Sequence, residues 1–379
     1  MPRIRSHLSL IATAAVLSFT SIPASAVSFN QINLVTDDQA ANPAQITDPG
    51  LKNAWGMSFG PTTPFWVSAN GSGTANLYAV NPGTQATTKQ GLTVSIPGDG
   101  SVTGQVFNSS ASFNSDRFLF VSEDGTVSGW RPTLTPNTAA ETIASASAAN
   151  VYKGAAIGNV SGHDYLYAAN FRTGAIDAYK GDAAAPALSG SFTDTTLPSG
   201  YAPFNVQNLN GSLYVSYAQQ DAAKHDEIAG LGKGFVDQFS LNGDFMGRVA
   251  SGGTLNAPWG MAIAPSSFGP MAGDLLVGNF GDGHINIYDP STHAFLGQLL
   301  DANNQPVVID GLWAISAGND ASGGSSHLLY FTAGPNDEAH GLLGVLAPVP
   351  EPSAYAMMLA GLGLLMLAIK RRVVYMKAS

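Results

Sequence analysis

Short apolar runs separated by turn residues recur along this chain. Three such runs lie between Trp259 and Pro290, from a Trp-Gly-Met segment to a Gly-His-Ile-Asn-Ile-Tyr segment. A similar series occurs near the start, between Trp55 and Pro82, about 204 residues earlier. Two copies this far apart indicate an internal repeat with further copies between them.

One strand of each repeat has a recognisable pattern of a glycine, an aliphatic residue two positions later and usually an aromatic residue three positions after that. Clear copies end at Trp130, Tyr179, Phe239 and Tyr288, and weaker copies end at Val80 and Leu346. The spacings between the six end positions are 50, 49, 60, 49 and 58 residues. Periods near 50 with several strands in each unit are typical of propeller blades.

Two further runs precede each of these strands, and the first is rich in glycine and alanine. Small residues suit the innermost strands of a propeller, where bulky side chains from all blades would collide. We therefore predict an all-β, six-bladed β-propeller over residues 27–347. The segment from Phe29 to Val35 is expected to pair as the outer strand of the sixth blade and close the ring, which removes an exposed edge. A seven-bladed ring and a pair of sandwiches remain alternatives.

The Trp-Gly-Met inner strands and the Gly-x-Ile-x-x-Tyr segments resemble those of NHL and gluconolactonase-type six-bladed propellers. The resemblance extends over the whole body of the chain. In gluconolactonase-type propellers, a carboxylate and amides hold a divalent cation in the central tunnel. The resemblance therefore implies a tunnel site and leaves open whether this chain is an enzyme.

Both ends of the chain have the features of targeting segments. Residues 1–26 have a charged start, an apolar stretch from Leu8 to Ile22 and a small-residue Ala-Ser-Ala end, which predicts a secretory signal peptide. A short membrane anchor is the alternative. At the other end, residues 348–379 contain a Pro-Glu-Pro motif, an apolar segment that predicts a transmembrane helix over about 353–369, and a basic cluster.

This C-terminal order resembles the PEP-CTERM sorting signal of Gram-negative bacteria. The matching residues are Pro350, Glu351, Pro352, Lys370, Arg371 and Arg372. The resemblance implies an exosortase-type partner that removes the anchor, a membrane-anchored precursor, and delivery to the cell surface or the extracellular matrix. Extracellular polysaccharide is then a candidate partner. An ordinary tail anchor after a Pro-rich linker is the alternative.

The composition excludes several kinds of site and argues against a nucleic-acid partner. The chain has no cysteine, which excludes disulfides and thiolate metal sites. Between Val27 and Val349 there are 10 Lys and Arg against 25 Asp and Glu, a net charge of −15. Binding to nucleic acid through its phosphates needs clustered cations, so we expect no nucleic-acid partner.

Polar residues at the ends of the second strands are candidates for a metal site. Glu123, Asn170 and Asn279 follow such runs and are expected on one face of the ring. Carboxylate and amide oxygens suit calcium, so these three residues are the candidate ligands. The alternative is that they only cap strands, because Asn and Asp tolerate turn geometry.

Two other segments bear on function. The insertion at 219–233 lies between the second and third strands of the fourth repeat. It is either a lid over the tunnel mouth, with His225, Asp226 and Glu227 pointing inward, or a solvated loop.

The Gly-x-Ser-x-Gly segment around Ser58 matches a nucleophile elbow, but the equivalent position in the fifth repeat is Ala262 and no helix pattern follows. We therefore expect an exported binding or scaffold protein, with a calcium-dependent hydrolase or lactonase as the alternative.

Overall fold

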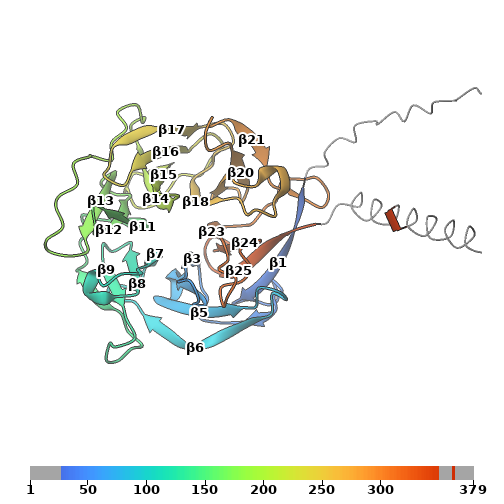
Figure 1. The fold of residues 1–379 in the computed structure, drawn as a ribbon, viewed down its shortest axis with the longest axis horizontal. Helices are drawn as coiled ribbons and strands as arrows, with labels where there is room; N and C mark the ends of the chain where they lie inside the picture. Colours follow the sequence, from blue (N-terminus) through green and yellow to red (C-terminus); the bar gives the residue numbers. More distant parts are fainter. Residues whose placement is uncertain (1–26, 350–360, 363–379) are drawn as a thin grey trace, which may run out of the picture.

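The computed structural model describes residues 27–349 and 361–362, and residues 27–349 form six β-sheets arranged around a central axis (Figure 1). Within each sheet, neighbouring strands are mostly antiparallel and follow one another from the axis to the rim. The predicted six-bladed propeller is confirmed. The alternatives of seven blades or a pair of sandwiches do not describe this ring.

The first three blades follow one another along the chain. Blade one comprises β3 (Ala54–Ser58), β4 (Phe65–Ala69), β5 (Thr74–Val80) and β6 (Thr87–Ser95). Blade two comprises β7 (Val102–Phe107), β8 (Phe118–Ser122), β9 (Val127–Trp130) and β10 (Glu141–Ala144). Blade three has three strands, β11 (Tyr152–Val160), β12 (His163–Asn170) and β13 (Ala175–Lys180). Short 3₁₀ helices lie at η1 (Asn70–Ser72) and η2 (Phe113–Ser115).

The last three blades complete the ring. Blade four comprises β14 (Tyr201–Leu209), β15 (Ser212–Gln219), β16 (Phe235–Ser240) and β17 (Phe245–Ser251). Blade five comprises β18 (Pro258–Ile263), β19 (Leu275–Asn279), β20 (Ile285–Tyr288) and β21 (Phe295–Gln298), with η3 (Gly269–Met271) before β19. Blade six comprises β23 (Leu312–Ala317), β24 (Leu329–Ala333), β25 (Leu342–Pro348) and β1 (Ser28–Thr36).

Blade six joins the two ends of the propeller. β1 pairs antiparallel with β25, from Phe29 opposite Pro348 to Thr36 opposite Leu342. The short strands β2 (Ile46–Thr47) and β22 (Leu300–Asp301) pair parallel with β1. The strand expected over 29–35 therefore lies in the outer position of the sixth blade. It pairs along the edge that β25 would otherwise expose.

Glycines allow the inner strands to approach one another at the axis. A Cβ atom on Gly56 would overlap the backbone of Thr103 in the next inner strand, and one on Gly260 would overlap the carbonyl oxygen of Trp313. Glycines also make the turns into third strands, where Gly125 and Gly283 have φ angles of 84° and 72°. These positions have a packing or conformational requirement that only glycine meets without strain.

The tunnel has two mouths, which we name by strand direction. The upper mouth is where inner strands begin, and the lower mouth is where they end. Aromatic rings fill the upper part, since Trp313 stacks on Trp55 at a centroid distance of 3.6 Å and on Phe280 at 4.0 Å. Trp259 packs edge-on against Trp313. The ring is therefore closed by side chains near its upper mouth.

The predicted signal peptide, 1–26, lies outside the described residues. So do Pro350, Glu351, Pro352, the basic cluster and almost all of the predicted membrane helix. Within 27–349 and 361–362, no helix has the length and apolar character needed to cross a bilayer. The signal peptide and the membrane helix remain predictions.

Candidate functional site

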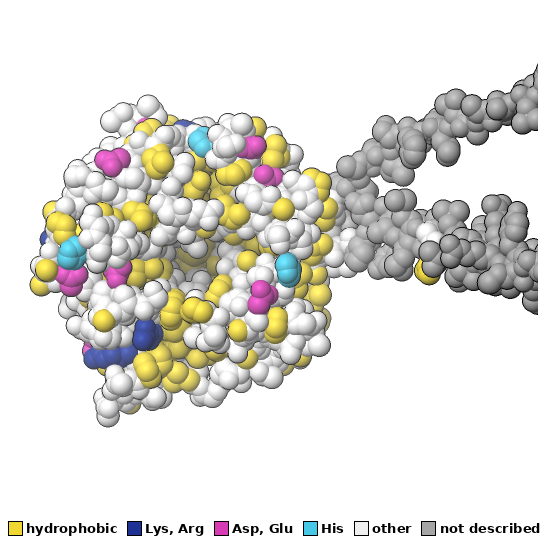
Figure 2. Space-filling model, in the orientation of Figure 1, with side chains coloured by type: hydrophobic (Ala, Val, Ile, Leu, Met, Phe, Trp, Pro, Cys, Tyr) yellow, Lys and Arg dark blue, Asp and Glu magenta, His cyan; other side chains and the backbone are white. Residues whose placement is uncertain are grey.

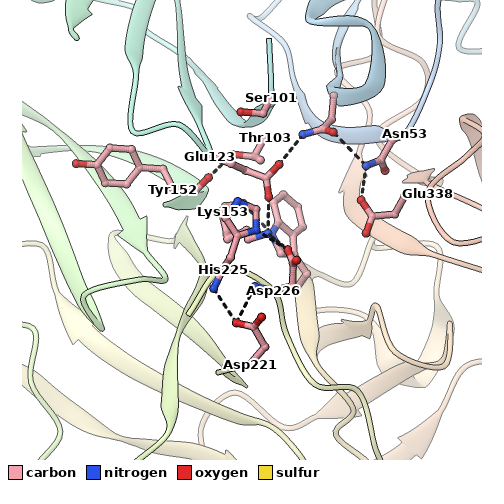
Figure 3. A network of polar contacts seen from close by, with 12 residues as sticks. Asn53, Ser101, Thr103, Glu123, Tyr152, Lys153, Asp221, His225, Asp226 and Glu338 are labelled. Carbon is pink, nitrogen blue, oxygen red and sulfur yellow. Dashed lines mark hydrogen bonds and ion pairs between the residues drawn. The ribbon is translucent and has the colours of Figure 1, made fainter. Parts of the chain in front are cut away.

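The upper mouth holds a cluster of four carboxylates around one buried lysine. We call Lys153, Glu123, Asp226, Glu227 and Glu338 the lysine-centred cluster. Figure 3 labels four of them, Lys153, Glu123, Asp226 and Glu338. Lys153 is the second residue of β11 and is 1% exposed. Its Nζ donates to Glu123, and lies 5.2 Å from the ring centroid of Trp55. A buried ammonium group thus sits between an aromatic face and carboxylates, an arrangement that stabilises positive charge.

The insertion in blade four supplies further members of the cluster. Asp226 accepts a hydrogen bond from Lys153 Nζ at 3.2 Å, and the Asp226 carboxylate lies 2.8 Å from His225 Nδ1. The backbone N–H groups of His225 and Asp226 donate to the Asp221 carboxylate, which fixes the turn (Figure 3). This insertion therefore reaches from blade four to the inner strand of blade three.

A chain of side-chain amides connects the cluster to blade six. Asn70 Nδ2 donates to Glu123 at 3.1 Å, and Asn53 Nδ2 donates to Asn70 Oδ1 at 3.4 Å. Asn53 also donates to Glu338, and its Oδ1 accepts from Trp313 Nε1 at 2.8 Å. Because each amide both donates and accepts, the orientation of one member depends on the next.

The cluster changes the proton affinity of its members. Burial by itself lowers the pKa of Lys153, but the carboxylates of Glu123, Glu227 and Asp226 outweigh it, and the pKa is raised above its ordinary value. Burial raises the pKa of Glu227, and burial together with the Glu227 charge raises the pKa of Glu338 to about 7. Burial would raise the pKa of Asp226, but Lys153 and His225 lower it overall.

The three candidate metal ligands lie at the upper face, each after a second strand or at its end. Glu123 is in the lysine-centred cluster. Asn170 donates to Asn150 at 3.0 Å and to Asp177 at 2.8 Å, all within blade three or its preceding loop.

The hydrogen-bond partners of Asn279 likewise lie within its own blade, blade five, or in the loop before that blade. It donates to Thr254 at 2.8 Å and to Asp282 at 3.0 Å, and accepts from Asn286. Each asparagine therefore has hydrogen-bond partners near its own blade.

Among the described residues, the side chains whose possible metal-ligand atoms lie close together differ from the three predicted ones. One ligand atom each from Glu123, His225 and Asp226 lie within 4.8 Å of one another. A cavity of about 530 Å³ borders this set and is lined by Glu123, His225, Arg172 and residues of the loops at 99–101 and 146–150. Carboxylates and imidazole are able to bind a divalent cation there, in competition with the Lys153 ammonium group.

Lys153 and Glu338 were missed by sequence reasoning. Lys153 stands one position before the Gly-Ala-Ala run of an inner strand, and Glu338 directly follows Asp337 in a pair of acidic residues that is typical of a turn. The available signal was a lysine near the start of an innermost strand, in a body of net charge −15. A lysine buried there needs carboxylate partners.

Comparison with known proteins gives relatives over most of the chain. Uncharacterized protein R648 of Acanthamoeba polyphaga mimivirus is 29% identical over 342 residues, which cover 85% of this chain and 81% of the relative. The likeness therefore includes most of the propeller.

Solved propellers share the fold at low sequence identity. An alpha-l-arabinofuranosidase of Fusarium graminearum aligns with a TM-score of 0.53 and 11% identity, over 86% of this chain and 98% of that structure. A PQQ-bound aldose sugar dehydrogenase of Streptomyces coelicolor aligns with a TM-score of 0.50 and 16% identity, over 86% and 99%. These likenesses concern the fold alone.

The C-terminal segment has a more specific match. Residues 348–372 match the PEP-CTERM protein-sorting motif. This confirms the resemblance of the Pro-Glu-Pro, apolar and basic segments to that signal. The motif implies a C-terminal anchor, processing by an exosortase, export and sorting to the cell surface. The chain is a six-bladed β-propeller that carries a PEP-CTERM sorting motif, which begins at the last residue of β25.

Proposed function

We propose that this protein is displayed on the cell surface or in the extracellular matrix of a Gram-negative bacterium, where its propeller works as a binding module. The observation that carries the proposal is the place where the sorting motif joins the ring. The match begins at residue 348, the end of β25, and Pro348 is paired with Phe29 of the outer strand. The described chain thus leaves from blade six at the side of the ring (Figure 1). Attachment at the side would leave both tunnel mouths accessible.

Fractionation and intact-mass measurement of the native protein test this display. The wild-type protein is expected at the surface or in the matrix, without residues 1–26 and without the segment after the sorting motif. Replacing Pro350, Glu351 and Pro352 together by alanine should leave the protein in the membrane fraction at a higher mass. Ser353→Ala, directly after the motif, is the control. Surface delivery of the triple variant at the wild-type mass would contradict the proposal.

A calcium-dependent hydrolase or lactonase is the second candidate. The convergence of Glu123, His225 and Asp226 beside a cavity of about 530 Å³ favours it. Asn170 and Asn279 remain candidate ligands for the same ion. Because Lys153 already contacts Glu123 and Asp226, a calcium ion at this position would have to compete with an ammonium group.

Calorimetric titration with calcium distinguishes the two candidates. If calcium binds at this mouth, Glu123→Gln should weaken binding and Lys153→Met should strengthen it. The melting temperature of the wild-type protein should rise with calcium concentration, because binding to the folded state alone stabilises it. A titration without heat, together with an unchanged melting temperature, would exclude the calcium-dependent enzyme.

A further inference from the structure

The lower mouth of the ring holds a cavity with a chemistry unlike that of the upper mouth. Its volume is about 390 Å³, within the range of roughly 300–1,000 Å³ common for small-molecule sites. Five blades line it, with uncharged polar side chains from Ser58, Gln105, Gln207, Asn208 and Ser316 and apolar ones that include Phe59 and Phe107. No ionisable side chain is among these lining residues of the described chain.

Gln105 lines this cavity and has an acceptor without a partner in the described part of the chain. It is 5% exposed, and its Nε2 donates to the carbonyl oxygens of Gly56 and Trp66, both at 2.8 Å. These two bonds fix the amide orientation, since the reverse orientation would place Oε1 against two acceptors. Oε1 is buried and has no partner among the described residues. A buried acceptor without a donor is costly, so a ligand that donates a hydrogen bond here is favoured.

Two neighbouring side chains add further free groups. The Ser58 hydroxyl is buried and has no partner in the described part of the chain. Ser58 is the last residue of β3, and the chain continues through a turn into β4 with no helix between them. The structure thus lacks the strand–turn–helix of a nucleophile elbow in this segment. Gln207 is partly exposed and also lines the cavity.

The residues that line the lower cavity favour an uncharged ligand. A carboxylate or phosphate would lose hydration without gaining a cation, and the net charge of −15 over residues 27–349 would repel it. A cationic ligand would find no carboxylate in the lining. A neutral ligand rich in hydroxyl groups can donate to Gln105, exchange hydrogen bonds with Ser58 and Gln207, and place its C–H surface against Phe59 and Phe107.

The tunnel narrows directly behind this cavity. The next space, lined by Gly56, Gln105, Asn205 and the inner strands of blades five and six, has a volume of about 10 Å³. A polymer therefore cannot pass through the ring and has to enter by one end. The face drawn in Figure 2 is hollowed near its centre, and the hollow is bordered by hydrophobic side chains (yellow) and by atoms of the backbone or of uncharged polar side chains (white).

We propose that the lower mouth binds the end of a neutral saccharide chain through Gln105, Ser58 and Gln207. This inference rests on the binding role proposed above and gives it a ligand class and a place. The upper mouth, with its carboxylates, is not part of this site.

Calorimetry on the full-length protein in detergent tests the site. The probes are neutral tetrasaccharides of glucose, galactose, mannose and N-acetylglucosamine, with tetragalacturonate as the charged counterpart. At least one neutral probe should bind, and tetragalacturonate should bind at least about ten-fold more weakly. Gln207→Ala and Ser58→Ala should each weaken binding about ten-fold, the effect of one lost hydrogen bond of about 1.4 kcal/mol. Phe295→Ala, on the exposed outer strand of blade five, should leave binding unchanged.

The outcomes separate this inference from surface display. Failure of every neutral probe to bind a folded protein overturns the saccharide site, as does unchanged binding in both Gln207→Ala and Ser58→Ala. Equal binding of tetragalacturonate overturns the selection for neutral chains. Saccharide binding by a protein that fractionation finds away from the surface would overturn the display proposal alone.

Discussion

Lys153 of blade three and Glu123 of blade two form an ion pair that is almost closed to solvent. The side chains are 2% and 13% exposed, and the Lys153 ammonium group lies over the ring of Trp55 in blade one. Side chains from three blades therefore contact one another at the Lys153 ammonium group. Since Asp226 from blade four also contacts Lys153, the ammonium group connects most of the upper mouth.

Removal of this charge should destabilise the protein strongly. In Lys153→Met the carboxylates of Glu123, Asp226 and Glu227 lose their shared cation while the aliphatic part of the side chain is kept. Breaking a buried ion pair on one side typically costs about 3–5 kcal/mol. We expect a loss of this size in the free energy of unfolding, measured by urea denaturation at pH 8. Lys180→Met, at an exposed position of β13, should change it by less than about 0.5 kcal/mol.

Glu338 should make stability depend on pH. Its pKa is about 7 in the folded protein against an ordinary value of 4.5, so between these values the folded state holds a proton that the unfolded state has lost. This contribution is complete below pH 4.5 and is lost as the pH rises through 7. It corresponds to roughly 1–3 kcal/mol, at about 1.36 kcal/mol for each pKa unit and allowing for partial solvent screening.

Glu338→Gln isolates that contribution. The variant keeps an oxygen that accepts from Asn53 but has no carboxyl group, so it should be more stable than the wild-type protein at pH 8 and similar at pH 5. Asp116 and Asp237 also have pKa values raised to about 6, mainly by burial. Their contribution to the pH dependence of stability is the same in the wild-type protein and in the variant. Denaturation curves at the two pH values measure the difference, and an equal pH dependence in both proteins would contradict the assignment to Glu338.

The sequence predicted the ring well because its determinants are local and repeated. Short apolar runs, turn residues and small inner-strand residues recur along the repeats, and the expected closing strand takes the outer place beside β25. The upper site was less predictable. Glu123 was identified from its strand end, but Lys153 and Glu338 contact its network only after blades two, three and six are brought around the axis.

The lower cavity shows another limit of sequence reasoning. Ser58 attracted attention as a possible nucleophile, yet in the structure it lines an uncharged cavity with Gln105 and Gln207. Gln105 is significant because both of its amide hydrogens are used by neighbouring backbone carbonyls, which leaves the oxygen free. That distinction depends on the distance between adjacent blades and has no counterpart in the sequence pattern.

A methyl group at the axis should disturb the contact between two blades. In Gly260→Ala the added Cβ meets the backbone carbonyl of Trp313, which cannot rotate away as a side chain could. Overpacking of this kind typically costs about 1–3 kcal/mol, and we expect a loss in that range by urea denaturation. Gly91→Ala, in β6, is the matched control because no atom lies within 4 Å of its new Cβ. Equal stability of the two variants would mean that the inner strands separate easily.

Loss of the aromatic anchor on the closing strand should open the ring at blade six. Phe29 is 1% exposed and its ring lies 4.5 Å from that of Phe268, between centroids. Phe29→Ala leaves a cavity beneath β1 and should lower the free energy of unfolding by about 3–5 kcal/mol. Asn30→Ala, at the exposed adjacent position of the same strand, should have little effect.

Amide exchange shows where that energy is lost. In Phe29→Ala, exchange should increase first along β1 and β25, because their pairing depends on the anchor, while the ladder of blade three stays protected. Since Phe29 is only three residues beyond the predicted cleavage site after Ala26, cleavage further along the chain would remove the same contact. A uniform increase in exchange across all six blades would instead indicate that the ring opens as one cooperative unit.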